Sequence, residues 1–363
     1  MNLLQLALLG AAIGVPLGYA MQRTRLCFNS AYRQVLLKRD ATLLRAIVLA
    51  VVVQMAGLHA MAQFGAGGVQ VNAVPFFPVA SVIGGFIFGV AMAYAEGCSS
   101  TVWYRVGNGN LGALVTLIAF AVGEALTEVG FLAPLRESMQ AGQIAPADGS
   151  LATAPNFLGV TPWLVVAPVV VLALAWLWRA RDSRYLGGWG WRRAGLILGV
   201  IGALAWLVAW PTGWHYGVGV VGATGPWVRA PFEGMGVLNW GSFMLLAMPF
   251  GALIAARRYR EFRWQVPNGP STMRMATAGL IMGISATIAG GCNIGHGFTG
   301  VPALALSSLA ATLFTFLGAA IGNYLRFARP QRVELRANLS DEANSSTARP
   351  LAGRTGDSSL RSE

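Results

Sequence analysis

Apolar segments long enough to cross a membrane recur along the whole chain, and they constrain its fold more than any other feature. The hydrocarbon layer of a bilayer is about 30 Å thick, and about 20 helical residues cross it. Hydrophobic residues make up 55% of the sequence and charged residues only 11%, whereas about a quarter of a soluble domain is charged. The sequence therefore predicts an all-α polytopic membrane protein.

Of the 26 basic residues, 23 fall into four groups that alternate with the apolar segments, at 23–45, 179–193, 257–274 and 326–361. Lys and Arg concentrate in the cytoplasmic loops of membrane proteins. We therefore expect all four groups on the cytoplasmic side of a bacterial inner membrane. The net charge of +12 then reflects membrane topology and the lipid bilayer as partner, not binding to nucleic acid.

Hydropathy and charge together predict nine spans, with a periplasmic N-terminus and a cytoplasmic C-terminus. The first span has no basic residue before it, and we expect it to be retained, unlike a cleaved signal. Residues 330–363 are polar and are expected to form a disordered cytoplasmic tail. The expected spans are 2–20, 41–62, 79–97, 110–133, 161–179, 194–211, 237–256, 274–291 and 303–325.

One segment of the chain occurs twice. Residues 85–98 read GFIFGVAMAYAEGC and residues 279–292 read GLIMGISATIAGGC, with identical residues at six positions 194 residues apart. If the fifth span connects two sets of four, the two halves have opposite orientations, as in the inverted repeats of many transporters. We expect a first repeat at 1–133, a connector at 134–193 and a second repeat at 194–329.

Three short segments contain the cysteines. They read RTRLCFNSAYR around Cys27, EGCSSTVWYRVGNGN around Cys98 and GGCNIGHGFTG around Cys292. The last two interrupt apolar helices, and irregular backbone at membrane depth occurs only inside protein or along a wet cavity. Backbone N–H groups and helix N-termini in such segments suit anions. The further residues expected along this path are Gly97, Gly291, Ser99, Ser100 and Asn293.

The thiols themselves indicate the kind of ligand. A thiol is a weak hydrogen-bond donor with a polarisable sulphur, so a line of thiols suits an anion whose terminal sulphur is also soft. The alternative is that a cysteine on an apolar helix is an inert small hydrophobe, which explains Cys27 more readily than the duplicated Cys98 and Cys292. We expect no metal and no cofactor, because there is no CxxC or cofactor motif and the 3 histidines are scattered.

Four other polar residues are candidates for coupling or structural roles, because ionisable groups inside spans are costly and usually functional. Glu96 precedes a glycine–cysteine pair, and it is either a structural partner of Arg105 or a group that couples protons. Glu124 lies deep in the fourth expected span. His296 is explained more simply as a hydrogen-bonded structural residue than as a residue that tunes the outer loop.

The RLCFNSA segment, the two glycine–cysteine loops and the duplicated layout resemble the YeeE/YedE family of membrane proteins, which includes thiosulfate transporters. The resemblance covers residues 1–328. It implies an inverted-repeat fold with short re-entrant helices, and thiosulfate uptake for sulphur assimilation along Cys27, Cys98 and Cys292 by S–H···S contacts. Family members often work with a small TusA-like cytosolic protein, which is an expected partner here. Some relatives are linked to other sulphur or selenium compounds.

Two classes of function are compatible with the sequence. The first, which we favour, is a transporter of thiosulfate or a related sulphur anion. The second is a membrane thiol enzyme whose cysteines form persulphides and relay sulphur covalently. The absence of CxxC and of a cofactor motif weighs against the enzyme.

Overall fold

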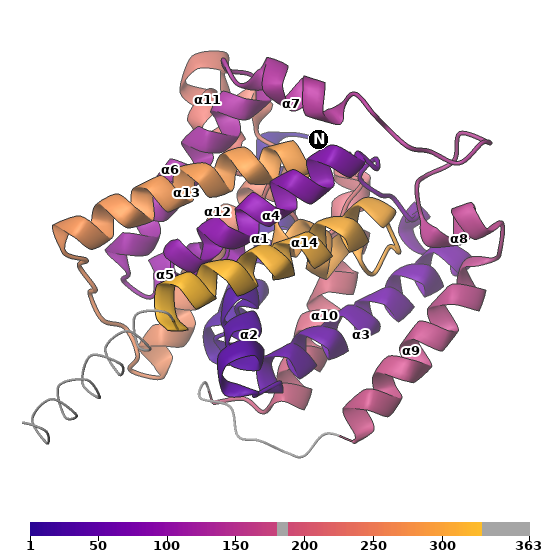
Figure 1. Cartoon of the computed structure of the whole chain (residues 1–363), viewed down its shortest axis with the longest axis horizontal. Coiled ribbons are helices and arrows are strands. Elements are labelled where there is room, and N and C mark those ends of the chain that lie inside the picture. The colour runs from indigo at the N-terminus through magenta and orange to yellow at the C-terminus, as the bar shows by residue number, and fades with distance from the viewer. Residues whose placement is uncertain (180–187, 329–363) are drawn as a thin grey trace, which may run out of the picture.

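The computed structural model describes residues 1–179 and 188–328, so the expected tail at 330–363 and part of the second basic group lie outside the described residues. The described residues form helices joined by loops (Figure 1). The α-helices are α1 (Leu3–Thr24), α2 (Phe28–Arg33), α3 (Thr42–Phe64), α4 (Pro78–Tyr94), α5 (Ser99–Gly107), α6 (Leu111–Glu128), α7 (Ala133–Gln140), α8 (Ala154–Leu158), α9 (Pro162–Trp178), α10 (Trp191–Ala209), α11 (Gly225–Glu233), α12 (Trp240–Arg258), α13 (Gly269–Ala289) and α14 (Leu306–Asn323). A π-helical segment, η5 (Ile294–Gly300), follows α13.

Among the described residues, 8 helices are long and apolar enough to cross a membrane, which confirms the all-α polytopic fold. They coincide with eight of the expected spans. The expected span at 161–179 is the apolar helix α9, which has 17 residues and is shorter than the others. The count of nine spans therefore stays a prediction.

The largest difference at a helix start is at α13. α13 starts at Gly269 instead of 274, because the Asn268 side chain accepts a hydrogen bond from the Ser271 N–H at 3.0 Å and Pro270 stands in the first turn. Both are favourable helix-start features. Hydropathy did not reveal this turn, because its residues are polar.

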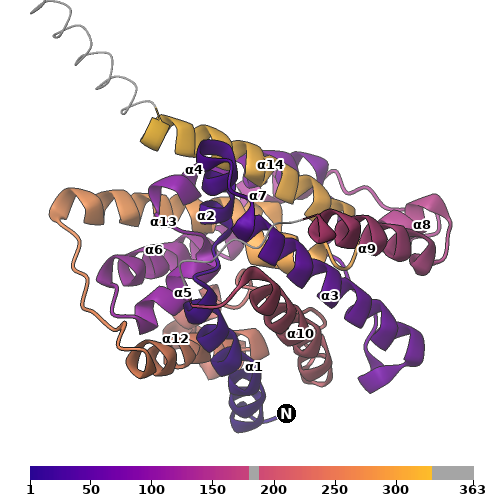
Figure 2. The same cartoon turned by 90° about the horizontal axis from the view of Figure 1, so that it is seen from below.

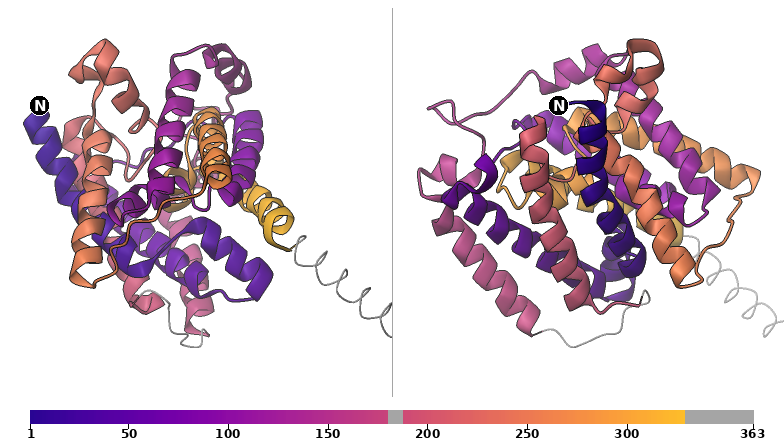
Figure 3. Two further views of the ribbon diagram at one scale, coloured as in Figure 1. Left: turned by 90° about the vertical axis from the view of Figure 1, so that its left-hand side faces the viewer. Right: turned by 180° about the vertical axis from the view of Figure 1, so that it is seen from behind.

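The long helices form two rows (Figure 2). In the first row, α6, α13, α4 and α14 pack side by side. The second row runs from α9 through α3, α10 and α1 to α12, and the rear view in Figure 3 shows it. Short segments bridge the rows: α5 contacts α12, α1 and α6, η5 contacts α14 and α3, and α2 contacts α3 and α14.

The order of helices recurs at the spacing of 194 residues that separates Cys98 from Cys292. The series α1 to α6 corresponds to α10, α11, α12, α13, η5 and α14. Neighbours recur as well, since α1 packs on α12 as α10 packs on α3, and α4 packs on α14 as α13 packs on α6. α4 and α13 run in opposite directions: Glu96, after the end of α4, contacts Arg274 near the start of α13, whereas Gly290, after α13, faces Val74 before α4.

Repeated glycines let the helices of the first row touch through their backbones. A Cβ at Gly89 of α4 would lie 2.2 Å from the Thr315 carbonyl oxygen of α14. A Cβ at Gly283 of α13 would lie 2.2 Å from the Phe120 carbonyl oxygen of α6. Close approach at small residues is a main source of helix association in membranes, where lipid surrounds the helices. Helix packing thus explains why both copies of the repeated segment have glycine at this position, Gly89 in the first and Gly283 in the second.

Replacing Gly89 or Gly283 by valine should therefore lower the stability of the folded protein, by about 1–3 kcal/mol each, because the added carbons force two backbones apart. The apparent melting temperature of the purified protein in detergent measures this. Gly269→Val is the matched control, since no atom lies within 4 Å of a Cβ there. Equal melting temperatures for all three variants would contradict the backbone contact.

Candidate functional site

Cys98 stands at the beginning of α5. Its carbonyl oxygen accepts a hydrogen bond from the Thr101 N–H at 2.9 Å, and its fully buried sulphur lies 3.1 Å from Thr101 Oγ1 and 3.3 Å from Ser100 Oγ. A Cβ at Gly97 would lie 3.1 Å from the Thr101 side chain, which is a tight contact. The thiol thus sits beside two hydroxyls at the positive end of a short helix.

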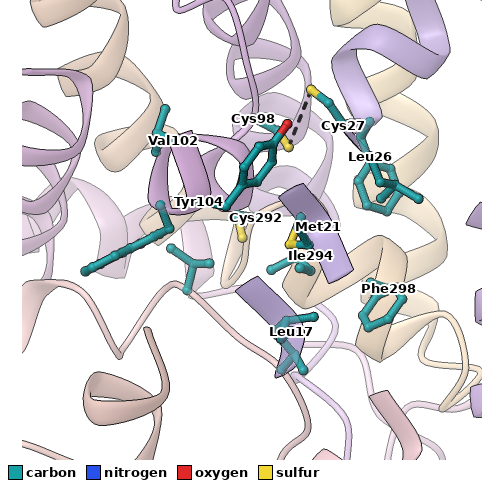
Figure 4. Close-up of a cluster of buried hydrophobic side chains, with 14 of the residues drawn as sticks. Leu17, Met21, Leu26, Cys27, Cys98, Val102, Tyr104, Cys292, Ile294 and Phe298 are labelled. Carbon is teal, nitrogen blue, oxygen red and sulfur yellow. Dashed lines mark hydrogen bonds between the residues drawn. The ribbon is translucent and has the colours of Figure 1, made fainter. Parts of the chain in front are cut away.

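Cys27 reaches the same place from the first cysteine segment. It precedes α2 in an extended conformation, and its sulphur lies 4.0 Å from that of Cys98 (Figure 4). Figure 4 also shows the hydroxyl of Tyr104, on α5, pointing toward this pair. Tyr104 was not among the residues expected at the site, although residues 100, 101 and 104 share one face of a helix.

Cys292 belongs to the same buried cluster and lies beyond Cys98 from Cys27 in Figure 4. The buried Ser99 side chain lies beside the Cys292 thiol. The side-chain nitrogen of Asn293 lies 3.0 Å from the sulphur of Met92, which belongs to the same cluster. The fold therefore gathers three thiols and the Ser99 hydroxyl from three separate segments.

His296 packs tightly beneath the Cys292 loop. Its buried ring places Nδ1 2.9 Å from Ser308 Oγ and Nε2 3.1 Å from the Ala289 carbonyl oxygen. A carbonyl only accepts hydrogen bonds, so Nε2 carries the proton and Nδ1 accepts from Ser308. A Cβ at Gly291 would lie 2.8 Å from Nε2, so glycine is required there. These are the contacts of a structural histidine.

Two cavities approach the thiols from opposite ends of α4. The arginine cavity, about 780 Å³, lies where α4 ends and has Cys27 in its wall. The glycine cavity, about 380 Å³, lies where α4 begins, and Gly290, Gly291 and Gly295 line it together with aromatic side chains. The arginines of the arginine cavity are Arg25, Arg33, Arg105, Arg260, Arg263 and Arg326.

Basic groups that are distant in the sequence meet at the arginine cavity. Glu261 joins the first group to the third through Arg23, at 3.0 Å. Glu96 joins the third group to the fourth through Arg274 at 2.7 Å and Arg326 at 2.5 Å. One end of the molecule is therefore strongly basic.

The Glu96 carboxylate does not bind Arg105, the structural partner that the sequence analysis considered. Arg105 Nη1 donates instead to the Glu96 carbonyl oxygen at 3.0 Å. The carboxylate is held by Arg274 and Arg326, which lie 178 and 230 residues further along the chain. No local sequence signal connects residues so far apart.

Glu124 is buried near the glycine cavity. Its Oε1 accepts a hydrogen bond from the Gly222 N–H at 2.6 Å, while its Oε2 has no partner among the described residues. Val220 and Val221, just before Gly222, line the cavity, and the Gly222 carbonyl accepts from Asn239 Nδ2 at 2.7 Å. Glu124, which lies on α6, thus forms a hydrogen bond to the segment that makes one wall of the glycine cavity.

The sequence pattern of a family described as Sulphur transport matches residues 23–321. The chain belongs to this family, the YeeE/YedE proteins. It is similar to a thiosulfate transporter, TsuA, of Spirochaeta thermophila, with 34% identity over 324 residues that cover 85% of this chain and 96% of that protein. TsuA of Escherichia coli K12 is 29% identical over 340 residues, which cover 89% of this chain and 95% of that protein. A probable transporter, YedE, of Salmonella typhimurium is 32% identical over 103 residues, which cover 28% of this chain and 25% of that protein.

Membership confirms the family resemblance and makes the chain a multi-pass membrane protein of sulphur-compound transport. The family and these relatives are named as transporters, not as enzymes, which agrees with the expectation of transport. Within the two described stretches, no group of three His, Cys, Asp or Glu residues is arranged to hold a metal ion. The expectations of no metal and no cofactor stay predictions.

We expect Glu124→Ala to lower the stability of the protein, by about 1–3 kcal/mol, because it leaves the buried Gly222 N–H without an acceptor. Glu124→Gln keeps an acceptor oxygen and should lose much less. Thermal unfolding of the two purified variants in detergent gives the comparison. If the glutamine variant unfolds as early as the alanine variant, the Gly222 hydrogen bond is not the cause.

Proposed function

We propose that this protein takes up thiosulfate across the bacterial inner membrane along a path past Cys292, Cys98 and Cys27. The observation that carries the proposal is the gathering of three buried thiols in one cluster between two cavities at opposite ends of α4. The similarity to two proteins named thiosulfate transporters supports the choice of substrate.

The proposed orientation of the protein in the membrane follows from the positions of its basic residues. Residues 1–133 and 194–329 form two inverted repeats joined by a connector at 134–193, a division supported by the recurring helix order and by the opposite directions of α4 and α13. The arginine cavity faces the cytoplasm. The glycine cavity then faces the periplasm, and the chain begins outside and ends inside.

The physical argument concerns a dianion in a low-dielectric medium. An isolated charge costs on the order of tens of kcal/mol to bury without partners, so the path needs donors throughout. The thiols of Cys292, Cys98 and Cys27 and the hydroxyls of Ser99 and Ser100 supply neutral donors. Neutral donors stabilise the anion less than a buried arginine does, which favours onward movement over retention. The soft thiol sulphurs suit the terminal sulphur of thiosulfate.

The thiol enzyme remains the second candidate, because one observation favours it. The sulphurs of Cys27 and Cys98 are 4.0 Å apart, close enough for a persulphide to pass between them after a small movement. In such a relay a thiolate would attack the outer sulphur of thiosulfate and sulphite would leave, so only the outer sulphur would reach the cytoplasm. By either route, a TusA-like protein would receive the sulphur on the cytosolic side. A selenium analogue of the substrate would contact the same thiols.

Uptake of doubly labelled thiosulfate into liposomes that contain the purified protein tests the function. We expect both sulphur labels to accumulate inside in equal amounts, at a rate well above that of empty liposomes. Accumulation of the outer sulphur alone would favour the thiol enzyme. No uptake of either label would contradict thiosulfate transport.

Cysteine variants test the path in the same assay. Cys98→Ala and Cys292→Ala should each abolish uptake, and Cys27→Ala should reduce it less. Serine keeps a hydroxyl donor but loses the soft sulphur, so Cys98→Ser and Cys292→Ser should fail nearly as completely. Ser285→Ala is the matched control, because this buried hydroxyl bonds to the Ile281 carbonyl of its own helix. Full uptake by the alanine variants would show that the thiols only fill space.

A further inference from the structure

Glu96 has a backbone conformation that glycine adopts and other residues rarely do. Its φ is +61°, in the left-handed region. The position that corresponds to it in the second half of the chain is Gly290, whose φ is +78°. The two turns therefore have the same backbone conformation, with glutamate in one and glycine in the other. Glycine adopts this conformation without strain, whereas glutamate does not. A strained residue persists when its surroundings hold it in place.

The side chain of Glu96 explains what holds it. Its Oε1 lies 2.7 Å from Nη2 of Arg274 and 2.5 Å from Nη2 of Arg326. The carboxylate stands in the wall of the arginine cavity, where the Glu96 side chain is 34% exposed. Arg326 also donates to the carbonyl oxygens of Ala93 and Tyr94. One carboxylate oxygen thus pairs with two guanidinium groups. Glu96 lies in the segment that contains Cys98, in the wall of the arginine cavity.

The arginine cavity poses a problem for a transported dianion. An anion that leaves Cys27 enters a space lined by six arginines and two carboxylates. Guanidinium groups bind oxyanions with two parallel charge-assisted hydrogen bonds, which are about twice as strong as neutral ones. With all these arginines available, the cavity would hold the dianion and delay its release.

We propose that the arginine cavity is an oxyanion-binding site and that Glu96 is its built-in competitor, which keeps the affinity low enough for release. The inference rests on the proposed function, since it concerns the end of the same path. The carboxylate neutralises Arg274 and Arg326, so an exiting dianion meets weaker net attraction. The second carboxylate, Glu261, is held at 3.0 Å by Arg23, a buried arginine that lies over the Tyr259 ring, and its distance to the cavity residue Arg25 is longer, 3.7 Å.

The test uses Glu96→Gln, which removes the charge and keeps the shape, and Glu96→Gly, which also relieves the backbone strain. Equilibrium binding of thiosulfate and of sulphate to the purified protein is measured at low salt, together with KM and the maximal rate of uptake into liposomes. Both variants should bind both anions about tenfold more tightly. Their KM and maximal rate should fall together, because release becomes slower.

Two further measurements separate competition from a purely structural role. Exposed charges are screened by salt, so the gain in affinity should shrink at high salt. Glu96→Gly should melt no earlier than the wild type, because it loses an ion pair but gains an unstrained turn. Glu137→Gln, a carboxylate outside the cavity that pairs with Arg136, is the matched control and should change neither affinity nor rate.

Unchanged or weaker anion binding in Glu96→Gln, accompanied by slower uptake, would overturn the proposal and leave Glu96 as an ion pair that only joins α13 and the segment after α14 to the turn after α4. That result leaves wild-type uptake of thiosulfate intact. Failure of the proposed function looks different, because the wild-type protein itself would then neither bind nor transport thiosulfate.

Discussion

Irregular backbone inside a bilayer has to be enclosed by protein, because its N–H and C=O groups find no water there. The cysteine segments break their helices at membrane depth, so they depend on the two rows of long helices on either side. The rows can enclose them because glycines bring neighbouring helices into backbone contact, as at Gly89 and Gly283. α5 and η5 then place Cys98 and Cys292 in the space between the rows.

The two ends of this space differ in charge, and the difference suits the proposed transport of an anion into a cell. Glycines and aromatic side chains line the glycine cavity, whereas arginines line the arginine cavity. Between them the donors are neutral: among the described residues, Cys27, Ser100 and Thr101 lie within hydrogen-bonding distance of the Cys98 sulphur. Under this account, positive charge draws the anion inward and the Glu96 carboxylate limits its retention.

Much of the fold was predictable because membrane thickness and apolar composition determine helix length. The expected spans coincide with the observed apolar helices, whereas the inverted repeat stays a prediction. The polar first turn of α13 was missed, because its start depends on the Asn268 cap and not on hydropathy.

The candidate site was predictable only where its residues are close in sequence or repeated. Ser100 beside Cys98 follows from one helical turn, whereas the approach of Cys27 to Cys98 depends on how α1 packs. The binding of Glu96 by Arg326 and the Gly222–Glu124 hydrogen bond depend on contacts between the two halves of the chain. A single sequence contains no local signal for such contacts.

The account is tested most directly by the side from which each thiol can be reached. A membrane-impermeant thiol reagent added to the periplasmic side should modify Cys292 faster than Cys98. In inverted vesicles the order should be reversed, and thiosulfate should protect both thiols better than sulphate does. Equal modification of both cysteines from either side, unaffected by thiosulfate, would contradict a thiol-lined path between the two cavities.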